Sequence, residues 1–391
     1  MVKLMEAVQN TNLRAALDAI ATMAAQPDDT ARGAAPVVYT SPELLELEQE
    51  RIFDREWACV GRADELPDRG DYMTTTVGRT PVLINRRKDG TLGAMANICA
   101  HRMAAVAEGR GNAPRFVCPY HAWTYEEDGK LLGAPHMPRD FDKSECGLDQ
   151  LALEIWNGYI YVNPDPDAPS LTSRLEPLTA LFRNYHLGEM RIMHKETEIW
   201  EGNWKVATEN FIESYHLTVV HAASIGHMAP MQAIAMAEEG PGFAFHRVLT
   251  PPEAILPMPG SLQKPNPDIS DDERMTIYAG CVFPNHLFTV QHDQVTWMRT
   301  QPISTDRTLI EWGVAGAFDW EGDKPDPQHP EFYYLREMPH VNGEDRGVVE
   351  SVQKGARSGR KKPGRLHPVE HGIVTFSRYL NRQLRASEGA D

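Results

Sequence analysis

Two short segments, Cys99-Ala-His101 and Cys118-Pro-Tyr-His121, each combine one cysteine with one histidine. Thiolate and imidazole are both good metal ligands, and a set of two cysteines and two histidines ordinarily indicates zinc. Zinc fingers and ribbons, however, group like ligands, with Cys next to Cys and His next to His. The mixed pairs therefore predict a metal site at the tips of two neighbouring loops that differs from a zinc finger.

The order of the four residues suits an iron–sulfur cluster of the Rieske type. In that [2Fe-2S] cluster two cysteines bind one iron and two histidines bind the other, so each loop contributes one of each. The spacing favours this cluster over the alternatives, which are a zinc ribbon or four incidental residues. The predicted cluster ligands are Cys99, His101, Cys118 and His121.

Composition limits the kinds of protein that the chain can be. Its 391 residues are 41% hydrophobic and 24% charged, which is ordinary for a soluble globular protein and enough for two domains. The formal net charge of −16 argues against a nucleic-acid partner. No apolar run is long enough to span a membrane, and residues 1–25 do not resemble a secretory signal. We therefore expect a cytoplasmic protein with no membrane or nucleic-acid partner.

Turn residues and hydrophobic periodicity divide the chain. Residues 57–163 consist of short β-type runs, which predict a small antiparallel β domain with the ligand loops at one end. A linker rich in Pro and Asp, 164–169, follows this domain. Apolar residues at helical spacing in 1–27 predict an amphipathic helix, either an assembly element or a loosely packed arm. The predicted parts are an N-terminal helical arm (1–40), a cluster domain with a leading helix (41–165) and a second domain (166–391).

The second domain mixes predicted strands and helices. Residues 228–272, rich in Pro and Met, are predicted to be irregular, and four strands are expected between residues 275 and 315. A helix is expected to open at Asn342 and to place Asp345 in its first turn, where the helix dipole favours an acidic residue. A last helix is expected over 367–384.

This domain also holds a second set of potential metal ligands, in the segment from Glu213 to His221. Residues 204–216 have helical character, which would place Glu213 and His216 on one face. His216 and His221 are five residues apart, and a regular helix would separate them by about 140°. Two histidines and a carboxylate are the ligands of non-haem Fe(II) oxygenases. The histidines therefore predict a mononuclear iron site in which the helix ends or carries a π-bulge between them.

The two motifs together resemble the α subunit of Rieske non-haem iron ring-hydroxylating oxygenases. The cluster loops of that family resemble Cys99-Ala-His101-Arg102 and Cys118-Pro-Tyr-His121-Ala-Trp123, and its iron segment resembles the stretch from Asn203-Trp204-Lys205 to His221. The resemblance covers roughly residues 41–385. It implies that His216 and His221 are iron ligands, that Glu213 bridges rather than ligates, and that Asp345 is the third ligand.

The resemblance also implies an architecture and partners. The fold class would be α+β, with a small antiparallel β Rieske domain and a helix-grip (START-like) catalytic domain whose antiparallel sheet grips a long helix. One [2Fe-2S] cluster and one Fe(II) per subunit would act in a homotrimer or a hexamer. The chain shows no nucleotide-binding motif. A separate reductase containing flavin and an iron–sulfur centre, alone or through a ferredoxin, is therefore the expected donor, with O2 and a small organic molecule as substrates.

Two non-enzymatic classes compete with the oxygenase. A Rieske electron carrier predicts a much shorter chain with no second metal site. A structural iron–sulfur scaffold leaves Glu213, His216 and His221 without a role.

Glu213 points to a subgroup of the resembled family. The aromatic-ring dioxygenases usually carry Asp at this position, whereas Glu resembles the oxygenases of choline, carnitine and glycine betaine. The expected reaction is monooxygenation (hydroxylation or N-dealkylation) of a small quaternary or methylated amine held by cation–π contact. The alternative is hydroxylation, dihydroxylation or O-demethylation of an aromatic acid. The candidate aromatic residues are Phe211, Phe283, Phe288 and Trp297, and the candidates for binding an acid are His286, Gln291, His292 and Arg299.

Overall fold

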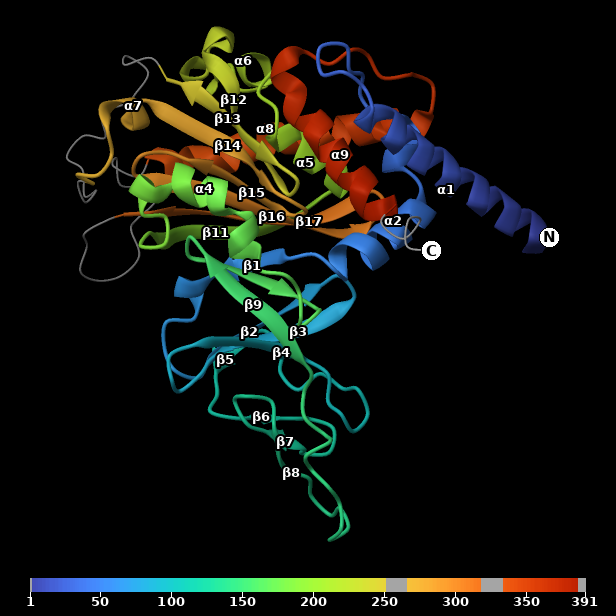
Figure 1. The fold of residues 1–391 in the computed structure, drawn as a ribbon, viewed down its shortest axis with the longest axis vertical. Coiled ribbons are helices and arrows are strands. Elements are labelled where there is room, and N and C mark those ends of the chain that lie inside the picture. Colours follow the sequence, from blue (N-terminus) through green and yellow to red (C-terminus); the bar gives the residue numbers. More distant parts are fainter. Residues whose placement is uncertain (1, 251–265, 318–332, 386–391) are drawn as a thin grey trace. The chain divides into compact units, whose positions relative to one another are not determined.

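The computed structural model describes residues 2–250, 266–317 and 333–385 (Figure 1). The chain forms two compact units, one of Gln49–Glu176 and the other of Met1–Glu48 with Pro177–Asp391. Both units combine antiparallel sheets with helices, so the α+β class predicted from the sequence is confirmed. No helix among the described residues is long and apolar enough to cross a membrane.

The unit Gln49–Glu176 contains two antiparallel sheets. Strand β3 shows how the larger sheet is packed, because Val82 and Ile84 enter one apolar core while Leu83, on the opposite face, enters a second core with Cys99 and Cys118. The larger sheet has the order β1 (Ala58–Arg62), β10 (Tyr159–Asn163), β9 (Gln150–Trp156), β4 (Leu92–Ala96), β3 (Thr80–Arg86), β2 (Asp71–Val77) and β5 (Arg110–Asn112). The smaller sheet has the order β6 (Phe116–Val117), β7 (Thr124–Tyr125) and β8 (Leu131–Gly133).

The second unit is built on one seven-stranded antiparallel sheet. Its order is β11 (Arg191–Trp200), β17 (Arg307–Gly316), β16 (Gln294–Ser304), β15 (His286–Val290), β14 (Thr276–Val282), β13 (Phe243–Leu249) and β12 (Ile234–Gly240). β12 and β13 lie within residues 228–272, so the prediction that this whole region is irregular is wrong. The two strands form a hairpin, and β13 also pairs with β14, so sheet pairing overrides the weak local signal.

Three helices pack against this sheet. α5 (Trp204–Phe211) contacts β14 and β16, α8 (Tyr333–Ser358) contacts β11, and α9 (His371–Arg385) contacts β13 (Figure 1). A long helix held by an antiparallel sheet is the arrangement that the family resemblance implied. The N-terminal helix α1 (Val2–Ala24) packs along α9. The other α-helices among the described residues are α2 (Pro42–Glu48), α3 (Leu171–Arg174), α4 (Glu176–Leu181), α6 (Leu217–Val220) and α7 (Asp271–Arg274).

Local interactions explain where α5 begins. The Asn203 side chain accepts a hydrogen bond from the Lys205 backbone N–H (3.0 Å), as an N-cap does. The Lys205 ammonium is fully buried and pairs with Glu48 at 2.7 Å, while the Trp204 indole N–H donates to the same carboxylate at 2.8 Å. A buried charge needs such partners. The start of α5 is therefore fixed, and with it the segment that leads to His216.

Candidate metal sites and substrate pocket

The two predicted cluster loops have the same backbone structure. In the first loop the Cys99 N–H donates to the Ala104 carbonyl (2.8 Å), and the Cys99 carbonyl accepts from the Met103 N–H (2.8 Å). In the second loop the Cys118 N–H donates to the Trp123 carbonyl (2.8 Å), and the Cys118 carbonyl accepts from the Ala122 N–H (3.0 Å). The fourth residue after each cysteine, Met103 or Ala122, has a left-handed backbone with φ of 61° or 57°. Each loop therefore turns back on its own cysteine.

This structure separates the four predicted ligands into two pairs. Cys99 and Cys118 are buried, whereas His101 and His121 are exposed, with their Nδ1 atoms 3.1 Å apart. Burial raises the pKa of the Cys99 thiol, but hydrogen bonds from the Tyr125 hydroxyl and from backbone N–H groups outweigh it and hold that pKa below its usual value. A thiol that ionises readily and a converging imidazole pair fit a [2Fe-2S] cluster.

The segment carrying His216 and His221 differs from the predicted helix. α5 ends at Phe211, so the prediction of one helix over 204–216 is wrong for its last residues. His216 and His221 instead flank the single turn of α6, and their ring centroids are 5.2 Å apart. The main interruption of the helix thus precedes His216, and this break lets both rings point to one place.

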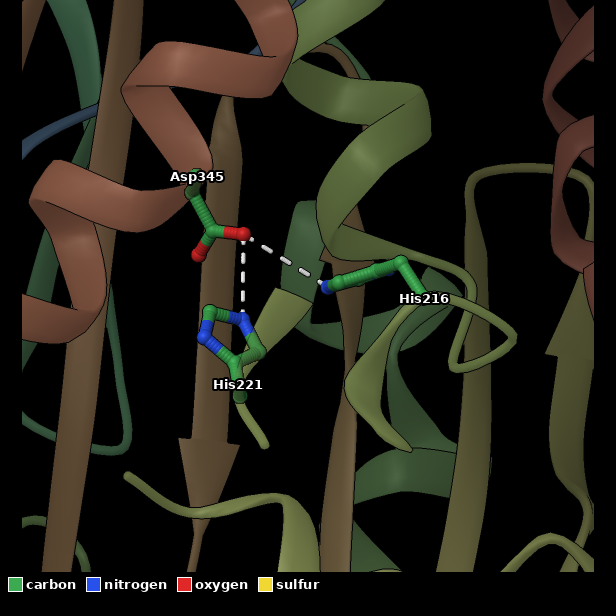
Figure 2. Close-up of side chains that lie close together, drawn as sticks. All are labelled: His216, His221 and Asp345. Carbon is green, nitrogen blue, oxygen red and sulfur yellow. Dashed lines mark ion pairs between the residues drawn. The ribbon is translucent and has the colours of Figure 1, made fainter. Parts of the chain in front are cut away.

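The Asp345 carboxylate points towards both imidazoles (Figure 2). Its Oδ1 is 3.5 Å from Nε2 of His216 and 3.1 Å from Nε2 of His221. The prediction that Asp345 is in the first turn of its helix is wrong, because α8 begins at Tyr333. Two imidazole nitrogens and a carboxylate oxygen that converge in this way form a donor set that fits Fe(II).

Each imidazole is held from its other side by a carboxylate. The Nδ1 of His216 lies 2.5 Å from Glu213 Oε1, and the Nδ1 of His221 lies 2.8 Å from Glu344 Oε2. With a metal bound, such a partner would keep the proton on Nδ1 and leave the lone pair of Nε2 for the ion. Burial lowers the pKa of His221, but the hydrogen bonds that its ring donates to Asp345 and Glu344 outweigh burial and hold that pKa above its ordinary value.

Three further polar residues complete this arrangement, and the sequence prediction missed their roles. Asn210 donates from Nδ2 to Asp345 Oδ1 (3.0 Å), and Ser224 donates from Oγ to Glu344 Oε2 (2.7 Å). His246 lies 2.5 Å from the Ser214 hydroxyl, and burial, together with nearby His216, lowers the pKa of His246 to about 4. The neighbours Asn210 and Glu344 lie inside the motifs already singled out, whereas His246 lies on a strand that was not predicted.

A pocket opens beside these residues, between the helices and the sheet. Its volume is about 130 Å³. A cavity of this size holds several waters or one small organic molecule. Glu213, His216, His221 and Asp345 all line it.

The predicted aromatic candidates are only partly in this pocket. Phe211 and Trp297 line it, whereas Phe283 and Phe288 are not among its lining residues. Alternation along β16 turns the Trp297 side chain to the face opposite Thr296 and Met298. Trp312, which pairs with Met298, was not a candidate from the sequence, yet it lines the pocket and is fully buried.

Most of the residues predicted to bind the carboxylate of an aromatic acid do not line the pocket either. Gln291 lines the pocket, while His286, His292 and Arg299 are not among its lining residues. Arg299 pairs with Glu311 at 2.8 Å. The described lining residues include no lysine or arginine, and their acidic members are Glu213 and Asp345.

Comparison with known proteins agrees with this structure. Residues 56–154 match the Rieske [2Fe-2S] domain, and residues 183–386 match the ring hydroxylating alpha subunit (catalytic domain). The chain therefore belongs to the family of ring-hydroxylating oxygenase α subunits, whose two domains bind a Rieske cluster and a mononuclear iron. The family resemblance and both cofactors predicted from the sequence are confirmed.

Relatives with different substrates share this family. The large subunit of anthranilate 1,2-dioxygenase from Acinetobacter baylyi is 35% identical over 209 residues, which are 50% of this chain and 44% of that protein. The glycine betaine monooxygenase oxygenase subunit of Chromohalobacter salexigens is 34% identical over 211 residues (54% and 47%). The chain thus spans about half the length of these two relatives. The carnitine monooxygenase oxygenase subunit of Escherichia coli is 27% identical over 379 residues (88% and 91%).

A solved structure shares the fold. The quaternary ammonium Rieske monooxygenase CntA in complex with L-carnitine superposes with a TM-score of 0.77. The match covers 91% of this chain and 96% of that one, at 24% identity. The shared fold extends over both units.

Proposed function

We propose that this protein is the terminal oxygenase component of a multicomponent Rieske oxygenase and that it oxidises a small quaternary or methylated amine. The observation that carries the oxygenase assignment is the convergence of His216, His221 and Asp345 at the edge of a pocket large enough for a small molecule. Neither an electron carrier nor a structural scaffold needs such a pocket.

The site residues have distinct roles in this proposal. Cys99, Cys118, His101 and His121 hold the cluster, and His216, His221 and Asp345 hold the iron. When bound, the cluster supplies single electrons and the iron activates dioxygen. Glu213 and Glu344 fix the two imidazole tautomers, and Asn210 orients the Asp345 carboxylate.

The pocket's charge and aromatic content support an amine substrate. The described lining residues offer no lysine or arginine, so none of them would pair with a carboxylate or repel a cation. Trp312 and Phe211 supply aromatic surface, which binds a quaternary ammonium that cannot donate hydrogen bonds. Relatives named for glycine betaine and carnitine add to this support.

The reaction that we propose inserts one oxygen atom into a C–H bond beside nitrogen. One atom of O2 enters that bond to give a hydroxyl group, and the other leaves as water with two electrons and two protons from outside the chain. If the hydroxylated carbon is lost from nitrogen, the outcome is N-dealkylation. We propose a separate reductase fed by NAD(P)H, alone or with a ferredoxin, as the electron source.

The alternative substrate is an aromatic acid. The relative named anthranilate 1,2-dioxygenase favours it, and Gln291 could bind its carboxylate. The lack of a lysine or arginine among the described lining residues makes it the weaker candidate.

The assembly and the domain limits belong to the same proposal. We propose a cytoplasmic homotrimer or hexamer, in which Glu213 bridges the iron of one subunit to the cluster of the next. The exposed position of His101 and His121 leaves the cluster open to a partner. For the functional parts we propose the helical arm (1–40), the Rieske domain (41–165) and the catalytic domain (166–391), of which residues 41–48 pack in the catalytic unit.

The test is a substrate panel with a surrogate reductase. Substrate-dependent NADH oxidation and product formation are measured for trimethylammonium compounds and for benzoate-type acids, with His216→Ala as the control for turnover at the iron site. We expect turnover of at least one trimethylammonium compound and none of the acids. Turnover of the acids with no response to trimethylammonium compounds would refute the amine assignment. NADH oxidation equal in wild type and His216→Ala would refute the oxygenase assignment.

A further inference from the structure

One transverse row of the catalytic sheet faces the pocket and carries two threonines that are not part of the iron site. His246 pairs with Ala279, Ala279 with Thr289, and Thr289 with Thr296, across β13, β14, β15 and β16. All four residues line the pocket. Residues paired in this way share one face of a sheet, so the row forms one wall of the pocket.

The two threonines differ from their neighbours along each strand. Thr289 and Thr296 are half-buried, whereas the residues before and after each of them are buried. Within the described residues, neither hydroxyl has a hydrogen-bond partner. As direct cross-strand partners, their Cβ atoms lie roughly 5 Å apart. Two adjacent hydroxyl groups therefore face the open space of the pocket.

The arginine of β16 and a lysine of β11 lie on the other face of the sheet. Arg299 alternates with Thr296 along β16, and it pairs with Glu311 at 2.8 Å. Lys195 also pairs with Glu311, at 3.0 Å. These cations are thus held by a carboxylate behind the wall. The wall itself offers hydroxyl groups, which bind an uncharged oxygen without any need for a counter-charge.

We propose that Thr289 and Thr296 are specificity-determining residues that bind an uncharged oxygen function of the substrate. The inference rests on the proposed function and narrows it. The substrate class is a methylated ammonium compound that carries a hydroxyl, ether or amide oxygen in place of a carboxylate. The two hydroxyls hold that oxygen, while the aromatic faces of Phe211 and Trp312 accommodate the ammonium group.

The test measures binding without turnover. Protein carrying its cluster and iron is titrated calorimetrically under argon with choline, glycine betaine and ethyltrimethylammonium. All three compounds carry a trimethylammonium group. Choline adds an alcohol, glycine betaine adds a carboxylate, and ethyltrimethylammonium has no oxygen. The variants are Thr289→Val and Thr296→Val, which keep the side-chain shape. Thr197→Val, at an exposed position on β11, is the matched control, and the visible spectrum of the cluster confirms that each variant is folded.

We expect wild type to bind choline more tightly than the other two compounds. Each pocket variant should weaken choline binding roughly 2- to 10-fold, the effect of one lost hydrogen bond, and leave ethyltrimethylammonium binding unchanged. Tighter binding of glycine betaine than choline, or equal choline binding in wild type and both variants, would overturn this inference and leave the proposed function intact. Failure of all three compounds to bind would overturn both this inference and the proposed amine substrate.

Discussion

Replacing Glu344 by glutamine tests how the iron site is built. In the structure its Oε2 accepts from His221 Nδ1 at 2.8 Å and from Ser224 Oγ at 2.7 Å, while its Oε1 is 3.3 Å from His340 Nε2. These contacts outweigh burial and hold the pKa of Glu344 below its usual value, so the group is a carboxylate at neutral pH. The amide keeps the shape of the side chain but loses the charge that stabilises the Nδ1–H tautomer of His221.

Loss of a carboxylate behind a metal-binding histidine typically costs 10- to 100-fold in metal affinity. For Glu344→Gln this corresponds to about 1.4–2.8 kcal/mol of Fe(II) binding free energy. The assay is competition for Fe(II) with a chelator, without oxygen, on protein whose cluster is intact. Glu350→Gln is the matched control, because Glu350 is on the same helix but does not line the pocket. An affinity of Glu344→Gln within twofold of wild type, or an equal loss in Glu350→Gln, would refute the reasoning.

Three more perturbations have expected outcomes. Cys99→Ser or His121→Ala should abolish the reduced-state EPR signal of the cluster, because an iron loses one of its two protein ligands, and a persisting signal would contradict the assignment. Glu213→Gln should weaken iron binding about as much as Glu344→Gln does. At saturating iron, Glu213→Gln should also slow the reoxidation of the cluster measured by stopped flow, whereas Glu344→Gln should not. Unchanged reoxidation in Glu213→Gln would exclude the bridging role. Burial raises the pKa of Glu209 from 4.5 to about 7, so the folded protein keeps a proton that the unfolded chain releases, and stability should fall as pH rises from about 4.5 to 7. That decline is worth at most roughly 3 kcal/mol of unfolding free energy, and Glu209→Gln should remove it. The measurement is urea unfolding of both proteins between pH 5 and 8. An equally steep decline in the variant would refute the raised pKa of Glu209.

The sequence was most informative where ligands are close together in the chain. The mixed Cys-His pairs need only local loops, and both loops form as short turns with the same hydrogen bonds. The cluster, the α+β class and the pair of His216 and His221 could therefore be anticipated, whereas Asp345 was predicted only from the family resemblance. The motif also fixed which segments the iron site would use.

The surroundings of that site come from contacts between distant segments. Asn210 and Asp345 are 135 residues apart in the chain, and His221 and Glu344 are 123 apart. No local pattern reports such pairs. Which of the side chains of Thr296 and Trp297 points to the pocket depends on the register of β16. That register is set by its pairing with β15 and β17. The start of α8 was misplaced because the expected cap at Asn342 lies inside a helix that packs on the sheet.

The most direct test of the central claim is the iron content of the purified protein and of His216→Ala. A [2Fe-2S] cluster and a mononuclear site require three irons per chain in wild type. His216→Ala should contain two irons per chain and keep the visible spectrum of the cluster. Two irons per chain in wild type, or three in His216→Ala, would contradict the assignment of His216, His221 and Asp345 as an iron site.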